Sequence, residues 1–422
     1  MNRMVKHLHI ENFKSIAKLD LDLDRFNIFI GENGCGKSNI LEAIALGAAS
    51  SANQLKKEVL VSRGIRVTRP ETMRAMFSSS NAKKSVNISF TLSQKAKNGL
   101  KSNINSGNNI ISEKIISFEL QNRNKPYSDW FDKDKIDGMS EFSRYFMDVF
   151  FSSKEEAMDS NGNTSVEISK IKDMIKELEI DESEKKFTKD FLKRMFIDTY
   201  NKSIYDDTLA GFAIYSPENS YLRKFEDEER IQPLGNKGEG LFKLLKVFSD
   251  EKKQTSLNTL KKYLKMIDWF DDIEIPGQAF GGEKIINLKD RFIDEQIFIQ
   301  QHNANEGFLF LLFYLSLLIS NDTPKFFAVD NVETSFNPKL CSEVIKVFNE
   351  LSREKNKQVI LTTHNPHILD GLNLEDNEQR LYVIRRNSNG ETIAKRIKPS
   401  RLSRKLSEAW MLGYIGGLPN NF

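Results

Sequence analysis

The sequence predicts an α/β fold with a parallel core sheet, antiparallel strands at the N-terminus and an α+β insertion. Three observations lead to this prediction. A glycine-rich loop joins a short apolar run at residues 26–30 to an amphipathic segment that begins at residue 39. Two later apolar runs, at residues 325–329 and 358–361, each end in polar side chains. Ahead of the glycine-rich loop, apolar and polar residues alternate as they do in half-exposed strands.

The N-terminal segment shows this alternation most clearly. Between residues 5 and 24, apolar residues alternate first with His7, His9 and Glu11 and then with three aspartates. We therefore expect two strands here. We interpret His7 and His9 as an outward strand face rather than a metal site, because no further ligands stand at zinc spacing nearby.

The glycine-rich loop fits the pattern G-x-x-x-x-G-K-[ST] of a phosphate-binding P-loop. Its glycines let the backbone aim N–H groups at phosphate oxygens, and the following helix N-terminus adds partial positive charge. Lys37 would reach the β- and γ-phosphates, and the Ser38 hydroxyl would hold Mg²⁺. The sequence thus predicts a site for a nucleotide with Mg²⁺. The candidate nucleotide-binding residues are Gly31, Asn33, Gly34, Cys35, Gly36, Lys37, Ser38 and Asn39.

The two later apolar runs would supply the rest of this site. Residues 325–330 form an apolar strand that ends in Asp330, the Walker B pattern. Ligands bind at the carboxyl ends of strands in open α/β sheets, so Ser38 and Asp330 are the candidate Mg²⁺ ligands. Residues 358–364 predict a second buried strand that ends in Thr-Thr-His. His364, at the end of this strand, would contact the γ-phosphate.

Composition describes a globular chain. With 422 residues, 39% hydrophobic and 29% charged, it is long enough to bury a sizeable core. The formal net charge of +3 neither requires nor excludes nucleic acid, and two cysteines fit a reducing compartment. The apolar run at residues 308–319 is shorter than the about 20 residues that span a bilayer. We expect a cytoplasmic protein with no membrane partner, and a buried core helix at this run.

Pattern changes along the chain predict four parts. Residues 1–50 and 211–375 are expected to form the two halves of the nucleotide-binding head, with an insertion subdomain at 51–210. Within the insertion we expect strands at 86–92 and 115–121, polar loops at 78–80, 98–109 and 159–164, and helical spacing at 168–201. A second glycine cluster at 234–240 predicts a turn before a helix. Residues 376–422 predict a hairpin and a terminal helix, a possible docking element.

Residues 8–15 (Leu-His-Ile-Glu-Asn-Phe-Lys-Ser) and 31–43 resemble the ABC-type ATPase heads of the SMC, RecF and OLD class. The segments around Asp330, Asn337-Pro338 and residues 362–366 resemble that class's Walker B, D-loop and switch-histidine segments. The resemblance covers about residues 1–50 and 210–375. The chain shows no sustained heptads, so it is more similar to the compact ATPases of bacterial anti-phage systems, OLD-like and Septu PtuA-like, than to true SMC proteins.

The resemblance implies that two heads sandwich two ATP molecules and that the signature segment of each completes the site of the other. The best match to the signature is residues 304–307, which assigns Asn305 and Gly307 to this contact. The class places a catalytic glutamate directly after the Walker B aspartate, where this chain has Asn331, whose amide cannot act as a general base. Either Glu333 substitutes or hydrolysis is slow. No Q-loop glutamine is identified.

These observations leave three hypotheses. The first is an ATP-binding subunit, slowly hydrolysing or ATP-locked, of an anti-phage complex. It would be at least a dimer and would regulate a separate nuclease, because the tail is too short for a nuclease domain. The second is a DNA-stimulated ATPase of repair or recombination, with DNA contacts at residues 395–398 or 401–405. The third and weakest is a P-loop kinase, which gives His364 no role.

Overall fold

The computed structural model describes residues 3–77, 83–95, 111–122, 128–133, 207–225, 233–250, 254–276, 284–399 and 404–418. The chain divides into two compact units, one of Met1–Trp130 with Asp207–Phe422 and one of Phe131–Asp206. Nearly all of the second unit lies outside the described residues, so the first unit carries the fold. The helical pattern expected at 168–201 and the loops expected at 78–80, 98–109 and 159–164 also lie outside the described residues.

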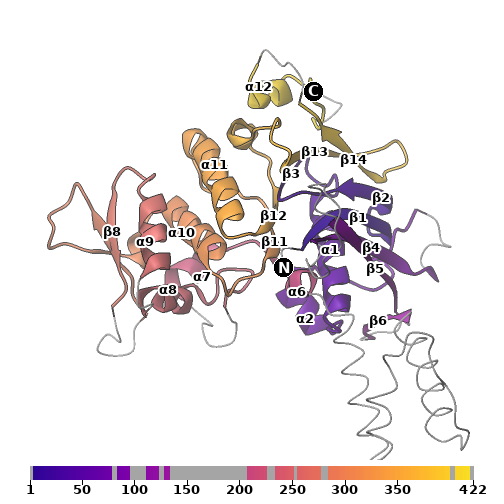
Figure 1. The fold of residues 1–422 in the computed structure, drawn as a ribbon, viewed down its shortest axis with the longest axis horizontal. Coiled ribbons are helices and arrows are strands. Elements are labelled where there is room, and N and C mark those ends of the chain that lie inside the picture. The colour runs from indigo at the N-terminus through magenta and orange to yellow at the C-terminus, as the bar shows by residue number, and fades with distance from the viewer. Residues whose placement is uncertain are drawn as a thin grey trace, which may run out of the picture. The chain divides into compact units, whose positions relative to one another are not determined.

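The core of the first unit is a six-stranded sheet in the order β14-β13-β3-β12-β11-β7 (Figure 1). The strands from β13 to β7 are parallel, and β14 runs antiparallel to β13. Every residue of β3, β11 and β12 is buried, as expected for parallel strands covered on both faces. The predicted parallel core sheet is confirmed. Its strands are β3 (Phe26–Ile30), β7 (Ile214–Tyr215), β11 (Phe326–Val329), β12 (Gln358–Thr362), β13 (Gln379–Arg386) and β14 (Thr392–Ile397).

The parallel arrangement brings three distant segments to one edge of the sheet. The registers pair Thr362 with Phe29 and Val329 with Leu361, so β3, β12 and β11 end side by side. The P-loop follows β3, Asp330 follows β11, and residues 363–364 follow β12. The candidate site therefore forms where the strands end.

A second sheet is antiparallel and has the order β2-β1-β4-β5-β6. The alternation read from the sequence is confirmed, because His7 pairs across the strands with Asp22, and His9 with Asp20. Their imidazole Nδ1 atoms lie 2.8 Å and 2.7 Å from the Oδ1 atoms of those aspartates. Burial alone would lower the pKa of His7, but hydrogen bonds to the two aspartates raise it. The strands are β1 (Met4–Phe13), β2 (Ile16–Asp22), β4 (Val86–Lys95), β5 (Ile111–Asn122) and β6 (Trp130–Asp132).

Strand pairing connects two of the predicted parts to the sheets of the head. We expected the insertion to begin at residue 51, yet β4 pairs with β1 and β5 extends the same sheet. The chain up to Trp130 thus belongs to the head. For residues 376–422 we predicted a hairpin and a terminal helix. β13 and β14 pair antiparallel there, and β13 also pairs with β3, so the hairpin extends the core sheet. Periodicity identifies a strand but not its partner, so the sequence did not predict these pairings.

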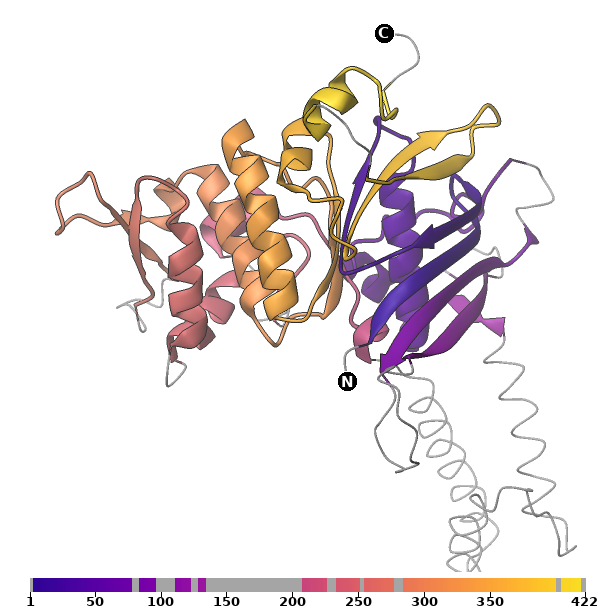
Figure 2. The ribbon, with the colours of Figure 1, turned by 45° about the horizontal axis from the view of Figure 1, so that its top comes forward.

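Alternate residues of β3 enter two different cores. Phe29 packs with α1 (Lys37–Ser51) and the antiparallel sheet, and Gly47 of α1 fits so closely that a Cβ there would lie 2.7 Å from the Phe90 ring. Phe26, Ile28 and Ile30 face the opposite core, which is built from helices and a small sheet (Figure 2). These elements are α7 (Asn219–Lys224), α8 (Leu241–Asp250), α9 (Thr255–Leu264), α10 (Glu306–Ile319), α11 (Pro338–Glu354), β8 (Phe270–Glu274), β9 (Asn287–Asp290) and β10 (Ile299–Gln300).

Shorter helices complete the described fold. They are α2 (Lys57–Ser62), α6 (Asp207–Ala210), η2 (Gln301–Asn303), η3 (Pro366–Gly371) and α12 (Leu406–Met411). The apolar run at residues 308–319 lies in α10, where all residues from Gly307 to Ile319 are buried, which confirms a core helix. In the described part of the chain, no helix is both long and apolar enough to cross a membrane.

A buried lysine closes the C-terminal end of α10. Lys357 is 0% exposed, and its Nζ donates to the Leu317 carbonyl at 2.7 Å and to the Thr323 hydroxyl. The last carbonyls of a helix lack partners within it, so this contact stabilises the end of α10. Burial, with the nearby charges of Lys325 and Lys355, lowers the pKa of Lys357 well below its usual value.

This lysine should give the protein a distinct pH dependence. The unfolded chain holds the Lys357 proton up to its ordinary pKa of about 10.4, whereas the folded chain releases it earlier. The free energy of unfolding of the wild type, relative to Lys357→Met, should therefore rise as the pH increases from 7 to 10. Urea unfolding across this range measures the difference. Lys346→Met, at an exposed position, is the control and should show no such trend. Parallel curves for Lys357→Met and the wild type would contradict the prediction.

Candidate nucleotide-binding site

The P-loop adopts a conformation that depends on its glycines. Gly31 has φ 147° and Gly36, the N-cap of α1, has φ 111°. A Cβ would lie 2.1 Å from the Ile384 carbonyl oxygen at Gly31 and 2.1 Å from Thr392 Oγ1 at Gly36. Only glycine fits both the dihedral angle and the space. The loop thus wraps onto the N-terminus of α1, as its sequence predicts.

Lys37 lies folded back over the loop. It is 5% exposed, and its Nζ donates to the carbonyls of Gly31 at 2.9 Å and Glu32 at 3.1 Å. Burial lowers the pKa of Lys37, while Cys35 and Asp330 act in the opposite direction. The charge is held at the mouth of the loop, where the phosphates of a nucleotide would lie.

The two candidate Mg²⁺ ligands face each other. Ser38 Oγ donates to Asp330 Oδ2 at 3.0 Å, and the Thr362 hydroxyl donates to Asp330 Oδ1. A hydroxyl and a carboxylate beside a phosphate-binding loop form the donor set that Mg²⁺ takes in nucleotide sites. The residues present therefore fit a Mg²⁺–nucleotide complex. Three segments distant in sequence meet at the Asp330 carboxylate.

The segments after β11 and β12 carry the candidate catalytic residues. Asn331 has φ 56°, a left-handed conformation that asparagine tolerates better than glutamate, and its N–H donates to Thr362 Oγ1 at 2.9 Å. Glu333 Oε1 accepts the backbone N–H of His364 at 2.8 Å. Partial burial lowers the pKa of His364, and the nearby charge of Lys37 lowers it further, which favours the neutral form of the ring. Glu333 and His364 thus lie together beside Lys37. The Glu333 carboxylate raises the pKa of Lys37, and the Lys37 charge lowers the pKa of His364.

Asn305 and Gly307 lie at the N-terminus of α10. Asn305 Oδ1 accepts the N–H of Gly307 at 2.9 Å and so caps the helix. A Cβ at Gly307 would lie 2.7 Å from the Ser335 carbonyl, which shows how closely α10 meets the segment after Asp330. Gly307 thus lies where α10 meets the segment after Asp330, and Asn305 is exposed at the same end of the helix.

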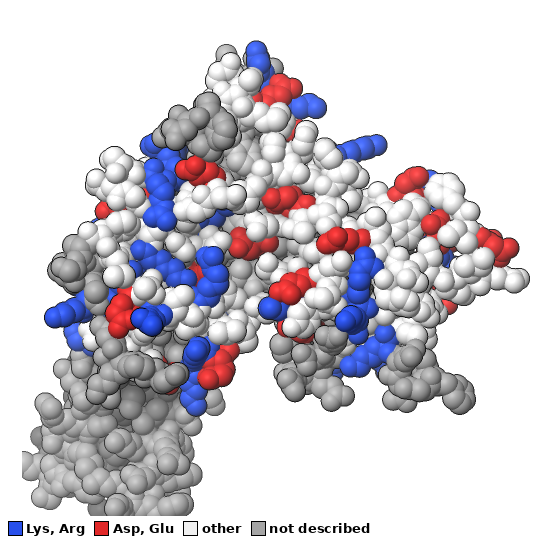
Figure 3. Space-filling model, turned by 180° about the vertical axis from the view of Figure 1, so that it is seen from behind, with Lys and Arg blue, Asp and Glu red and all other residues white. Residues whose placement is uncertain are grey.

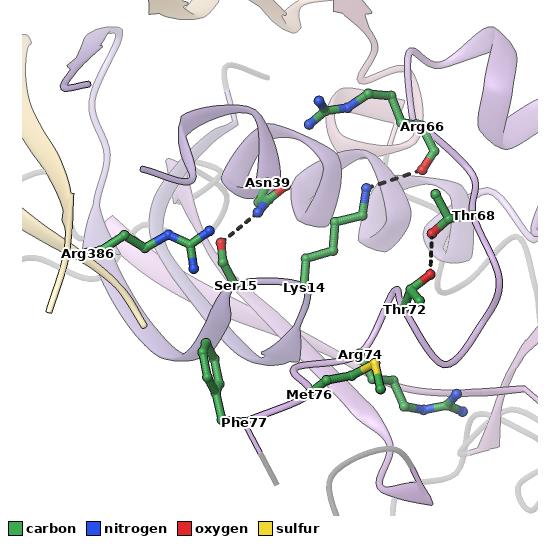
Figure 4. Close-up of a pocket in the computed structure, with 10 residues that line it drawn as sticks. All are labelled: Lys14, Ser15, Asn39, Arg66, Thr68, Thr72, Arg74, Met76, Phe77 and Arg386. Atoms are coloured by element: carbon green, nitrogen blue, oxygen red, sulfur yellow. Dashed lines mark hydrogen bonds between the residues drawn. The ribbon is translucent and has the colours of Figure 1, made fainter. Parts of the chain in front are cut away.

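Sequence reasoning missed a pocket of about 530 Å³ beside the P-loop (Figure 4). It combines four cations with apolar side chains, a combination suited to a nucleoside and its phosphates. Asn39 Nδ2 donates to Ser15 Oγ at 2.6 Å, and Arg386 Nε donates to the Gly34 carbonyl at 3.1 Å. Lys14 and Ser15 belong to the motif at residues 8–15. The sequence analysis used this motif for the resemblance but did not predict that these two residues line a pocket. The pocket is lined by Lys14, Ser15, Asn39, Arg66, Thr68, Thr72, Arg74, Met76, Phe77 and Arg386.

A second pocket, of about 210 Å³, is lined by Ser38 and Asp330 themselves. The glycine cluster at 234–240 does precede α8 as expected, but it also reaches this pocket. The N–H groups of Ser216 and Glu218 donate to the carbonyls of Asn236 and Lys237, both at 2.8 Å. Only the fold brings these residues to the Mg²⁺ side of the site. The other lining residues are Glu42, Gly64, Arg66 and Ile214.

The hairpin of β13 and β14 holds the P-loop in place. Thr392 is fully buried, and its Oγ1 donates to the Cys35 carbonyl at 3.0 Å and lies 2.7 Å from Ser15 Oγ. The Thr392 N–H also donates to the Ser15 carbonyl at 2.7 Å. Two ends of the chain are thus joined at the loop, and β14 lies beside β2 in both views (Figures 1 and 2).

Thr392→Val tests this support. Valine has the shape of threonine but lacks the hydroxyl, so the Cys35 carbonyl and Ser15 lose a partner. We expect ATP to bind about threefold to tenfold more weakly, measured by calorimetry. Thr91→Val on β4 is the matched control and should leave the affinity for ATP unchanged. An unchanged ATP affinity in Thr392→Val, even with a lower melting temperature, would restrict the hydroxyl to a structural role.

Comparison with known proteins agrees with this geometry. Residues 26–370 match the family described as "AAA domain, putative AbiEii toxin, Type IV TA system". Over 53 residues the chain is 43% identical to the DNA replication and repair protein RecF of Lactobacillus acidophilus, covering 12% of this chain and 14% of that one. Over 139 residues it is 29% identical to the uncharacterized protein MJECL10 of Methanocaldococcus jannaschii, and this match covers 32% of this chain and 61% of that protein. The chain thus spans less than two thirds of the length of these relatives.

Solved structures give the same fold at low identity. The structure described as the SmcHead bound to the C-winged helix domain of ScpA has a TM-score of 0.51 and 12% identity, and the match covers 94% of this chain and 98% of that one. At this identity the likeness shows the fold alone. The family match covers well over half of the chain. The protein therefore belongs to this AAA-domain family, and its fold is that of an SMC head domain.

Proposed function

We propose that the chain binds ATP with Mg²⁺ and hydrolyses it slowly. The observation that carries the proposal is the meeting of Lys37, Ser38 and Asp330 at one edge of the core sheet, with Ser38 Oγ 3.0 Å from Asp330 Oδ2. In this proposal Lys37 binds the β- and γ-phosphates, and Ser38 and Asp330 hold Mg²⁺, which neutralises phosphate charge. The pocket lined by Ser15 and Arg386 receives the nucleoside.

Hydrolysis requires water to attack the γ-phosphorus while the bond to the β–γ bridging oxygen breaks and ADP leaves. Asn331 stands at the usual position of the base, and its amide orients water without accepting a proton. Glu333 lies two positions further on, and its Oε1 keeps a lone pair beyond the one that accepts the His364 N–H. We assign the orientation of water to Glu333 and contact with the γ-phosphate to His364. The displaced carboxylate is the reason to expect slow turnover.

Self-association is the second part of the proposal. Gly307 meets the segment after Asp330 at Ser335, and Asn305 caps the same end of α10 and is exposed. A second copy that presents this helix N-terminus to the bound ATP would add donors at the γ-phosphate. Two such copies would hold two ATP molecules in a symmetric dimer, in which each interface is made of one P-loop and one signature segment.

The third part concerns biological role. The matching family carries the words AbiEii toxin and Type IV TA system in its description, which supports a role in bacterial defence. We propose that the dimer regulates a separate nuclease in an anti-phage complex. The docking surface would be the end of the chain, where four apolar side chains are exposed. They are Met411 at 52%, Leu412 at 53%, Tyr414 at 65% and Leu418 at 41%.

The alternative is an ATPase stimulated by DNA, as the RecF name of several relatives suggests. Lys395 is exposed on β14, while residues 401–403 of the second basic cluster lie outside the described residues. On the face seen in Figure 3, lysine and arginine are interspersed with acidic side chains. DNA-dependent turnover, with binding that weakens steeply as salt rises, would favour this alternative over the defence subunit.

ATP turnover by the purified chain tests the central proposal. We expect turnover well below the about 10 s⁻¹ typical of enzymes. Lys37→Ala should abolish nucleotide binding and turnover together. Glu333→Gln should lower turnover at least about tenfold and leave ATP binding intact, because the amide keeps the shape but not the basicity. Wild-type rates in Glu333→Gln would remove the assigned role of this residue, and tight binding without turnover would leave an ATP-locked scaffold.

Mixing two inactive variants tests the dimer. Lys37→Ala lacks a working P-loop, and Asn305→Arg places a bulky cation at the signature segment, so each variant alone should be inactive. In a mixed dimer one interface is intact, and random mixing should restore about a quarter of wild-type turnover. Asn305→Ser, which keeps a helix-capping side chain, is the matched control and should stay active. Absence of any restored activity would argue against shared sites.

A further inference from the structure

Two buried polar atoms beside the candidate site lack partners. Tyr314 is 1% exposed, and its hydroxyl makes no hydrogen bond in the described structure. Glu333 Oε2 is likewise buried without a partner, although Oε1 of the same carboxylate accepts the His364 N–H. A buried polar atom without a partner costs free energy, so each requires an explanation. One of these atoms is a donor and the other an acceptor.

The two residues belong to elements in close contact. Tyr314 lies on α10 seven residues after Gly307, so both lie on the same face of the helix, two turns apart. Gly307 meets the Ser335 carbonyl, and the Tyr314 ring packs against the Phe336 ring, with 6.2 Å between centroids. Ser335 and Phe336 belong to the turn that Glu333 begins, since the Phe336 N–H donates to the Glu333 carbonyl at 3.0 Å. One face of α10 therefore covers this turn.

The electrostatics agree with this placement. Burial raises the pKa of the Tyr314 hydroxyl, and Glu333 is the first of the charges that raise it further, ahead of Asp330. Burial and then Glu333 also raise the pKa of Cys341, on α11, to about 11. The Glu333 carboxylate thus acts on an apolar interior formed by α10 and α11, where Tyr314 supplies a hydroxyl donor.

We propose that Tyr314 is a positioning residue for Glu333: its hydroxyl donates to Glu333 Oε2, either directly after a small rotation of the carboxylate or through one bridging water. The inference rests on the proposed hydrolysis. With Oε2 held by α10 and Oε1 held by the His364 N–H, the carboxylate keeps one orientation and presents its remaining lone pair to water. The hydroxyl also completes the hydrogen bonding of both buried atoms.

In the proposed dimer, the contact between Tyr314 and Glu333 would also couple the two heads. The N-terminus of α10 carries Asn305 and Gly307, which a second copy would use, and Tyr314 follows two turns later. A shift of α10 on association would reach Glu333 through Tyr314, and His364 through Glu333. The orientation of Glu333 would then depend on whether the signature segment is engaged. This gives the single head a physical reason for slow turnover.

Tyr314→Phe is the direct test, because it keeps the ring that packs on Phe336 and Phe348 and removes only the hydroxyl. We expect kcat for ATP to fall about fivefold to tenfold with KM unchanged. In a Glu333→Gln background the same substitution should have no further effect on kcat. Tyr263→Phe on α9 is the matched control and should leave kcat unchanged. It removes another buried hydroxyl, and the charged groups that act on that hydroxyl are Glu350 and Glu354 rather than Glu333.

A stability cycle separates this proposal from the proposed hydrolysis. Urea midpoints of the wild type, Tyr314→Phe, Glu333→Gln and the double variant do not depend on turnover. If the hydroxyl and the carboxylate interact, the double variant should differ from the sum of the single changes. Additive midpoints would overturn the proposal whatever happens to kcat. If the wild type does not hydrolyse ATP, the proposed hydrolysis fails, and non-additive midpoints would still support the contact between Tyr314 and Glu333.

Discussion

The site depends on the carboxylate of Asp330. It accepts hydrogen bonds from Ser38, at the start of α1, and from Thr362, at the end of β12. Ser38 follows β3 through the P-loop, Asp330 follows β11, and Thr362 ends β12. The carboxyl ends of these three strands meet because the strands are parallel and in register. A parallel sheet must be covered on both faces, and the two cores on either side of β3 supply that cover. The position of the carboxylate thus follows from the packing of the whole unit.

The P-loop is supported from both ends of the chain. Ser15, in the turn after β1, and Thr392, on β14, meet beneath it, and Arg386 donates to the Gly34 carbonyl. Gln358 adds a further tie, because its side chain exchanges hydrogen bonds of 2.9 Å and 2.7 Å with the backbone of Val5. The antiparallel sheet and the C-terminal hairpin therefore act as one support for the loop. A loop held in this way is preorganised before any ligand binds.

Beyond the P-loop, the candidate site is formed by the segments after β11 and β12 and by the N-terminus of α10. Glu333 orients His364 through the backbone, while α10 covers the turn that contains Glu333. The helix N-terminus at Asn305 is capped by its own side chain and remains free to meet another molecule. In the dimer that we propose, association would complete the site and so connect nucleotide binding to assembly.

Local sequence determined much of this protein. The P-loop follows from glycines at positions where a Cβ would collide, and the strands follow from alternation or from continuous apolar runs. Asp330 and His364 were predictable because strand ends carry the ligands of α/β sheets. Only the tertiary structure decided which strands pair, and it placed β4 and β13 in the head rather than in separate parts. It alone gathered Arg66, Asn236 and Arg386 around the loop, because no local pattern records contacts between segments hundreds of residues apart.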